Sequence, residues 1–187
     1  MIEWGKDGYL EIIIGPMFSG KTSRLLTIKR QYEVCDISCC LVNHIDDKRY
    51  HETLASTHDM IMTESLNLRK LSFLYEKLDQ YDVFLINEGQ FFEDLFDVVV
   101  KLVEVHKKKI YVCGLNGDYR RQRFGTILDL IPFCDNVTKL NALCKKCKNG
   151  VPGIFTHRIT SEKIQKKVGS NDYIPLCRKC FLKNNLN

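Results

Sequence analysis

The residues best suited to chemistry form one run near the N-terminus, Gly15-Pro16-Met17-Phe18-Ser19-Gly20-Lys21-Thr22, which has the spacing G-x-x-x-x-G-K-[ST]. In such a run, backbone N–H groups and the N-terminus of the following helix surround the phosphates of a nucleotide. We expect Lys21 to reach the β and γ phosphates and the Thr22 hydroxyl to ligate Mg²⁺. The run therefore predicts a nucleoside triphosphate site; the alternative is a glycine-rich turn that binds nothing.

A second candidate site consists of cysteines in two identical pairs, Cys144-x-x-Cys147 and Cys177-x-x-Cys180. Four thiolates presented in this way favour a tetrahedral, structural Zn²⁺ site of the zinc-ribbon kind, with no open position for chemistry. The segment between the pairs is longer than the roughly 15 to 20 residues usual for such sites, which implies a sizeable loop. A disulfide framework and a redox-active CxxC pair are the alternatives, and a cytosolic chain without thioredoxin-like context disfavours both. The remaining cysteines are expected to be small buried hydrophobic residues: Cys35, Cys39, Cys40, Cys113 and Cys134.

The phosphate-binding run needs a strand before it and a helix after it, and the flanking residues fit both. The apolar run Tyr9 to Ile14 predicts the strand, and helical spacing of apolar residues behind Thr22 predicts the helix. Three further short apolar runs, at 38–42, 83–86 and 110–115, predict strands buried on both faces.

Apolar residues at helical spacing predict two more helices, over Phe92 to Lys107 and over Asn67 to Leu78. Alternating strands and helices indicate an α/β fold of the P-loop NTPase type, a parallel sheet with flanking helices. After about Leu140 the apolar periodicity fades, so we expect a nucleotide-binding domain over 1–140 and a zinc-binding lobe with a substrate lid over 141–187.

Composition is that of an ordinary folded protein, with 44% hydrophobic and 27% charged residues in a chain of 187. No apolar stretch approaches the roughly 20 residues that cross a bilayer, and the first residues do not resemble an export signal, so a cytoplasmic location is expected. The net charge of +5 comes from scattered basic residues. A solvated basic face that attracts anionic nucleotides explains this charge better than a nucleic-acid groove.

Five features together resemble the cytosolic-type (type II) thymidine kinase family over about Glu11 to Lys183. They are the phosphate-binding run, Thr57-His58-Asp59, Glu88-Gly89-Gln90-Phe91-Phe92, Phe124-Gly125-x-Ile127-Leu128 and the paired cysteines. The resemblance implies transfer of the γ-phosphoryl of ATP to the 5′-hydroxyl of thymidine with Mg²⁺, giving dTMP. It also implies deoxynucleoside salvage for DNA synthesis, a homotetramer, and no nucleic-acid or membrane partner.

The same resemblance assigns roles to individual residues. Glu88 matches the catalytic base, and its position after the apolar run 83–86 puts it at the carboxyl edge of the sheet, where the phosphate-binding run also opens. A second-shell Mg²⁺ contact is the alternative role for Glu88. Arg49 matches an arginine near the transferred phosphate, although a lone arginine in a loop is commonly a solvated surface charge.

The predicted ATP-binding set comprises the whole phosphate-binding run together with Asp47, Lys48, Arg49, Asn87, Glu88, Gly89 and Gln90. The predicted thymidine-binding set is Met17, Phe91, Leu115, Tyr119, Phe124, Tyr173 and a lid of Ile164, Gln165, Lys166, Lys167 and Val168. Apolar walls suit a flat base with a methyl group, and a lid excludes water during transfer. Several of these residues, Leu115 above all, suit a hydrophobic core equally well.

The chain departs from the family at two places. Asn87 stands where the family usually has Asp, and an amide brings no negative charge to Mg²⁺, so we expect weaker metal binding with the base intact. Lys166 and Lys167 stand in a lid that is mostly apolar in the family, which puts strict thymidine preference in doubt.

Two other functions remain open at this point. One is a zinc-ribbon P-loop ATPase or nucleic-acid-binding module; the absence of interleaved aromatic and basic residues around the cysteine pairs argues against it. The other, suggested by Asn87, is a kinase fold that binds nucleotide for regulation without turnover.

Overall fold

The structure is a computed structural model that describes residues 7–46, 65–162, 164–165 and 172–185. Within these residues a parallel sheet of six strands has the order β3-β2-β4-β5-β1-β6. The strands are β1 (Tyr9–Gly15), β2 (Cys39–His44), β3 (Ser65–Leu68), β4 (Val83–Ile86), β5 (Lys109–Leu115) and β6 (Asn136–Lys139). The parallel sheet and its flanking helices confirm the predicted fold class.

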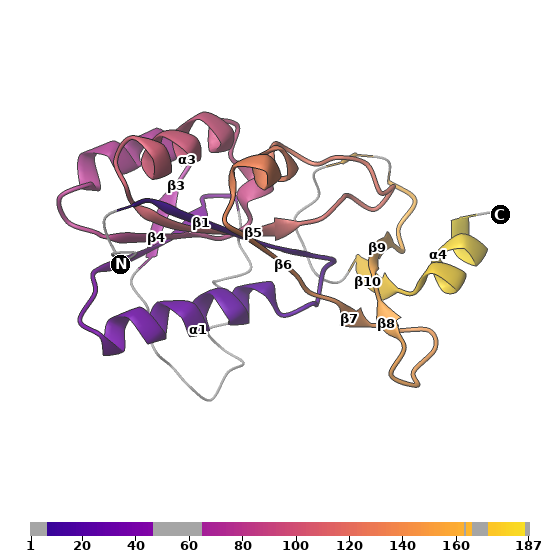
Figure 1. Cartoon of the computed structure of the whole chain (residues 1–187). Helices are drawn as coiled ribbons and strands as arrows, with labels where there is room; N and C mark the ends of the chain where they lie inside the picture. The colour runs from indigo at the N-terminus through magenta and orange to yellow at the C-terminus, as the bar shows by residue number, and fades with distance from the viewer. Residues whose placement is uncertain (1–6, 47–64, 163, 166–171, 186–187) are drawn as a thin grey trace.

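Helices cover both faces of this sheet (Figure 1). On one face lies α1 (Lys21–Val34), and on the other lie η1 (Leu71–Lys77), α3 (Leu95–Glu104) and η3 (Ile127–Phe133). Along β1, Ile12 belongs to the core beneath α3, and Ile13 belongs to the core beneath α1. Because successive strand residues point to opposite faces, the non-alternating apolar runs fill both cores at once.

A small lobe follows β6 and lies at one end of the molecule (Figure 1). It contains the β7–β8 hairpin (Ala142–Leu143 and Pro152–Gly153), the β9–β10 pair (Phe155–Arg158 and Tyr173–Leu176) and α4 (Arg178–Asn185). Its own core gathers Leu176 and Phe181 around the paired cysteines. The boundary at 140/141 stays a prediction.

The predicted helix over Asn67 to Leu78 is wrong in its first part. Asn67 and Leu68 belong to β3, which pairs with β2, and a 3-10 helix begins only at Leu71. The start of this helix is capped from outside, because the carboxylate of Asp94 accepts hydrogen bonds from the N–H groups of Leu71 and Ser72, each at 3.0 Å.

The other predicted helix, over Phe92 to Lys107, is shorter than expected. Phe92 ends a 3-10 turn, η2 (Gly89–Phe91), before α3 begins at Leu95. Lys107 has a φ of 53°, in the left-handed region that cannot continue a helix. Cys35 also differs from expectation because it is exposed, whereas Cys40 and Cys113 are buried.

Candidate functional site

The phosphate-binding run forms a tight loop between the end of β1 and the start of α1. Phe18 and Gly20 take left-handed φ values of 64° and 80°. Position 15 requires a glycine because the backbone of Leu140 comes very close: a Cβ there would lie 2.5 Å from the Leu140 carbonyl oxygen. The left-handed conformations of Phe18 and Gly20 turn the loop back toward the N-terminus of α1, where backbone N–H groups favour an anion.

Inside this loop, Lys21 and Ser19 both bond to the same carbonyl. The Lys21 Nζ donates to the Pro16 oxygen at 2.7 Å, and the Ser19 Oγ donates to it at 2.8 Å. Lys21 is 6% exposed. The ammonium is therefore held against the concave side of the loop.

The end of β4 lies beside the start of α1. The Thr22 Oγ1 donates a hydrogen bond to the Asn87 Oδ1 at 3.2 Å, and the Asn87 Nδ2 donates to the Asn43 Oδ1 at 3.1 Å. The Cys113 thiol also donates to the Asn87 Oδ1, at 3.0 Å. Asn87 is thus held by residues of three elements, α1, β2 and β5, and two uncharged oxygen atoms, Thr22 Oγ1 and Asn87 Oδ1, lie at hydrogen-bond distance from each other. Oxygen donors of this type suit Mg²⁺.

Glu88 follows directly and is 4% exposed. Its φ of 52° is in the left-handed region, which is uncommon for a residue with a side chain and turns the backbone sharply from β4 into η2. The Gln90 Nε2 donates a hydrogen bond to the Glu88 Oε2, and the Gln90 Oε1 accepts one from the Leu115 N–H at 3.1 Å. The end of β5 therefore orients Gln90, and Gln90 orients the carboxylate.

Two glycines make room for Gln90. A Cβ on Gly114 would lie 2.4 Å from the Gln90 Oε1, and a Cβ on Gly125 would lie 2.5 Å from the Gln90 carbonyl oxygen. Gly125 also has a φ of +62°. Gly125 is therefore needed for the close packing against Gln90, the residue that holds the Glu88 carboxylate.

Aromatic and apolar residues surround this edge of the sheet. The rings of Phe91 and Phe124 meet edge to face with centroids 5.5 Å apart, and His44 lies 5.8 Å from Phe91. Met17 is buried, and its N–H donates to the Thr156 Oγ1 of β9 at 3.0 Å. Thr156 thus joins the small lobe directly to the phosphate-binding loop.

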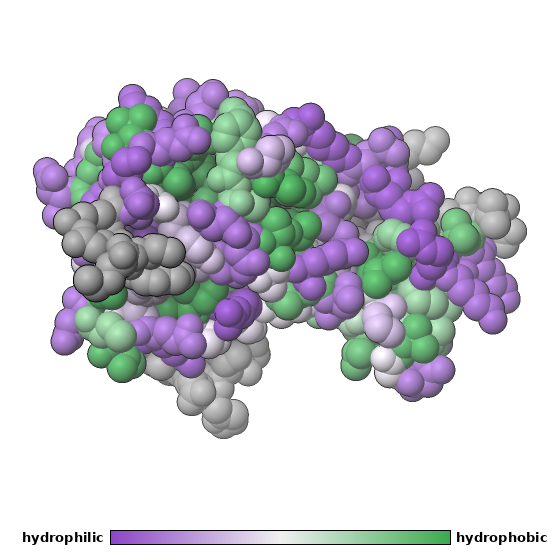
Figure 2. All heavy atoms as spheres, in the orientation of Figure 1, coloured by the Kyte–Doolittle hydropathy of each residue, from purple (hydrophilic) through white to green (hydrophobic). Residues whose placement is uncertain are grey.

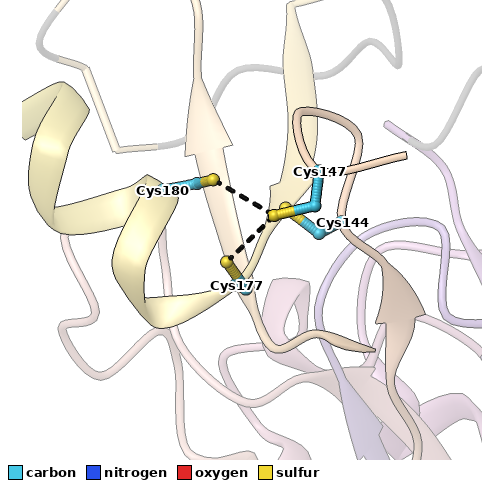
Figure 3. Close-up of side chains that lie close together, drawn as sticks. All are labelled: Cys144, Cys147, Cys177 and Cys180. Atoms are coloured by element: carbon cyan, nitrogen blue, oxygen red, sulfur yellow. Dashed lines mark hydrogen bonds between the residues drawn. The ribbon is translucent and has the colours of Figure 1, made fainter. Parts of the chain in front are cut away.

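In the lobe, the sulfur atoms of Cys144, Cys147, Cys177 and Cys180 all lie within 4.8 Å of one another (Figure 3). The Cys147 Sγ is 3.7 Å from that of Cys177 and 3.5 Å from that of Cys180. Tetrahedral Zn²⁺ with Zn–S bonds of about 2.3 Å places its sulfurs about 3.8 Å apart, so the cluster has the size that zinc requires.

The thiol pKa values in this cluster differ strongly. Burial raises the pKa of Cys144, but hydrogen bonds from the backbone N–H groups of Cys177, Cys147 and Lys146 outweigh it, and the pKa falls to about 6. Hydrogen bonding to Cys180, Cys144 and Cys177 raises the pKa of Cys147 to about 12. Cys144 therefore loses its proton more readily than Cys147, and Zn²⁺ binds cysteine as the thiolate.

A family model described as "Thymidine kinase" matches residues 8–181. The chain belongs to the thymidine kinase family. It is 36% identical over 175 residues to the thymidine kinase of Sheeppox virus (strain KS-1), covering 93% of this chain and 97% of that protein. It is 38% identical over 182 residues to the thymidine kinase of Oryza sativa subsp. japonica, covering 94% of this chain and 66% of that protein. Domain III of the Thermotoga maritima replication initiation protein DnaA aligns at 18% identity with a TM-score of 0.44, over 73% of this chain and 56% of that one.

In this thymidine kinase family member, the phosphate-binding loop, the residues 87–90 and Leu115 lie at one edge of the sheet. The phosphate-binding loop follows β1 and Glu88 follows β4, and both strands pair with β5, which ends at Leu115. Six predicted residues lie outside the described residues: Asp47, Lys48, Arg49, Lys166, Lys167 and Val168. Thr57-His58-Asp59 lies outside them as well.

Sequence reasoning assigned no role to Arg158 or Thr156. Arg158 is 5% exposed and its guanidinium lies 3.9 Å from the centroid of the Tyr119 ring and 5.0 Å from that of Tyr173. The available signal was weak: two polar residues two positions apart on one strand, which point to the same face.

In the described part of the chain, no helix is both long and apolar enough to cross a bilayer. The face in Figure 2 carries hydrophilic and hydrophobic residues side by side.

Proposed function

We propose that this thymidine kinase family member transfers the γ-phosphoryl of ATP to the 5′-hydroxyl of thymidine, giving dTMP and ADP. The observation that carries this proposal is the hydrogen bond between Thr22 and Asn87, which joins the phosphate-binding loop to the residue before Glu88. A phosphate site and a buried carboxylate at one sheet edge are the parts that phosphoryl transfer to a hydroxyl needs.

In the proposed mechanism, the phosphate-binding loop and Lys21 hold the β and γ phosphates. Phosphoryl transfer has a loose transition state, so positioning and charge neutralisation supply most of the rate. Lys21, beside the Pro16 carbonyl, brings one positive charge to this position. Arg49 is proposed to bring a second.

Glu88 is proposed as the general base. The 5′-hydroxyl gives its proton to the Glu88 carboxylate, its oxygen bonds to the γ phosphorus, and the bond from phosphorus to the bridging oxygen breaks to release ADP. The hydrogen bond from Gln90 holds one carboxylate oxygen, Oε2, and so orients the other toward the acceptor.

Mg²⁺, when bound, would neutralise charge on the phosphate oxygens. The Thr22 Oγ1 and Asn87 Oδ1 are the groups proposed to hold it, directly or through water. Because Asn87 is uncharged, we expect the metal to bind less tightly than it would beside an aspartate. Zn²⁺ in the cysteine cluster is proposed to be structural.

The thymine base is proposed to lie between Met17, Phe91, Leu115, Tyr119, Phe124 and Tyr173, with Ile164, Gln165 and the following lid residues over it. The rings of Phe91 and Phe124, which pack edge to face, support an apolar pocket for a flat base. A homotetrameric assembly and a cytoplasmic location are further proposals from the family resemblance. Light scattering on the purified protein tests the assembly.

The function is tested by incubating the protein with ATP, Mg²⁺ and each natural deoxynucleoside in turn, with mass analysis of the products. We expect thymidine monophosphate as the main product. Hydrolysis of ATP that only nucleic acid stimulates would support the P-loop ATPase or nucleic-acid-binding module instead, and ATP binding without turnover would support the regulatory binder.

A further inference from the structure

Arg158 is a buried cation held by uncharged groups. Its Nη1 donates hydrogen bonds to the carbonyl oxygens of Glu162, at 3.0 Å, and Ile164. Its Nη2 donates to the carbonyl oxygen of Gln165, at 3.2 Å, and to the Tyr173 hydroxyl. The remaining donor, Nε, is buried and has no partner among the described residues. The backbone of the segment after β9 therefore wraps around this guanidinium.

Two aromatic rings hold the same guanidinium. Tyr119, in the loop after β5, lies 3.9 Å from it, and Tyr173, at the start of β10, lies 5.0 Å from it. A guanidinium near the face of a ring is stabilised by the ring quadrupole, more so when desolvated. One side chain thus joins the loop after β5, which is distant in sequence, to the backbone that follows β9 and to the start of β10.

Gln165 provides a second connection between two of these segments. Its Nε2 donates to the Asp118 Oδ2 at 2.9 Å and to the Arg123 carbonyl oxygen at 3.0 Å. The other Asp118 oxygen accepts from the N–H groups of Arg120 and Gln122, each at 2.8 Å. Asp118 therefore braces the turn over 118–123 with these two hydrogen bonds, and Gln165 connects the start of the lid to that turn.

We propose that Arg158 is a positioning residue for the nucleoside acceptor: it holds the start of the lid, Ile164 and Gln165, against the loop after β5. This inference rests on the proposed function, because that loop carries Tyr119 and Phe124 of the proposed acceptor pocket. Ordering a free segment costs conformational entropy, so a lid start that is already held in place strengthens acceptor binding. The phosphate-binding loop takes no part in these contacts.

The test compares Arg158→Lys with the wild-type protein in steady-state kinetics. Lysine keeps the charge but lacks the planar set of donors that reaches several carbonyls and stacks on tyrosine. We expect the KM for the nucleoside to rise by roughly tenfold, since hydrogen bonds to a charged group are lost. The KM for ATP should change less than twofold.

Arg178→Lys is the matched control. Arg178 lies in the same lobe, exposed, with its guanidinium 5.0 Å from the Phe155 ring, and contributes nothing to the described lid contacts. Its replacement should leave both KM values unchanged. Hydrogen exchange of the peptide covering 159–165 in the unliganded protein gives a second readout, and we expect faster exchange in Arg158→Lys alone.

The outcomes separate this inference from the proposed function. If the wild-type protein phosphorylates thymidine but Arg158→Lys leaves the nucleoside KM unchanged, or raises both KM values equally, the positioning role is wrong and the function stands. If the wild-type protein accepts a different deoxynucleoside, the same comparison is made with that acceptor. If it phosphorylates none of them, both proposals fail.

Discussion

The Thr22 hydroxyl donates a hydrogen bond to the Asn87 Oδ1 at 3.2 Å, although the two residues lie at the start of α1 and just past the end of β4. This contact joins the phosphate-binding loop to the strand that leads into Glu88. It is made by a neutral amide at a position where the thymidine kinase family usually has an aspartate.

Replacement of Asn87 by Asp should tighten Mg²⁺ binding. A carboxylate keeps the oxygen that faces Thr22 and adds a negative charge beside the proposed metal position. Asn43 can adapt, because its buried Nδ2 has no partner among the described residues and an amide flip would turn it toward the new carboxylate. We expect half-maximal activity at a several-fold lower Mg²⁺ concentration. An unchanged apparent affinity would contradict the proposed role of position 87.

Replacement of Glu88 by Gln should remove turnover while nucleotide binding persists. The side chain keeps its size but cannot accept the hydroxyl proton, and general-base catalysis is worth roughly 10² to 10⁴ in rate. We therefore expect kcat to fall by about this factor with the KM for ATP little changed. Glu93→Gln, an exposed acid in the same stretch, is the control and should behave as the wild-type protein. Retention of more than a tenth of kcat in Glu88→Gln would mean that another group takes the proton.

Gly114→Ala should disturb the Glu88 carboxylate indirectly, by displacing Gln90. The added methyl group would lie 2.4 Å from the Gln90 Oε1 and 2.7 Å from the Ile127 Cδ1, so Gln90 must move and lose its hold on Glu88. We expect a loss of roughly 1 to 3 kcal/mol in the free energy of unfolding, typical of overpacking, together with a lower kcat. The comparison is Gly117→Ala, whose Cβ would meet its neighbours only at 3.5 Å or more. Equal behaviour of the two variants in denaturant melts and kinetics would argue against the orienting role of Gln90.

Cys147→Ser should abolish stoichiometric zinc binding. Its sulfur lies close to those of Cys177 and Cys180, so its loss leaves an incomplete tetrahedron. We expect elemental analysis to find about one zinc per wild-type chain and far less in the variant, with a lower unfolding temperature because metal binding contributes to folding. Cys35→Ser removes an exposed cysteine outside the cluster and should change neither quantity. Zinc retained at full stoichiometry by Cys147→Ser would exclude the four-cysteine site.

Sequence patterns predicted those parts of the molecule that are determined by residues close together in the chain. The phosphate-binding spacing, the cysteine pairs and the buried runs of β1, β4 and β5 are each visible within a few residues of chain. The strands β3 and β6 were not predicted. β6 is mostly exposed and β3 is partly so, and such edge strands lack the continuous apolar run of a buried strand.

In the candidate site, too, only the features that depend on nearby residues could be predicted from the sequence. Glu88 could be placed because it follows a recognisable strand, but the position of Gln90 depends on Gly114 and Gly125, which come from other parts of the chain. Arg158 bonds chiefly to backbone carbonyls and to the rings of Tyr119 and Tyr173. Backbone acceptors leave no mark in residue types, so the spacing of Thr156 and Arg158 indicates only that the two residues share a face of the strand, not that Arg158 makes these contacts.

The most direct test of the proposed phosphoryl transfer to thymidine uses ATP that carries a label on its γ phosphorus. The protein is incubated with this ATP, Mg²⁺ and thymidine. We predict that the label appears in thymidine 5′-monophosphate in an amount equal to the ADP formed, and that omission of thymidine stops ADP formation. Label released as inorganic phosphate at the same rate with and without thymidine would show that the protein hydrolyses ATP and does not phosphorylate a nucleoside.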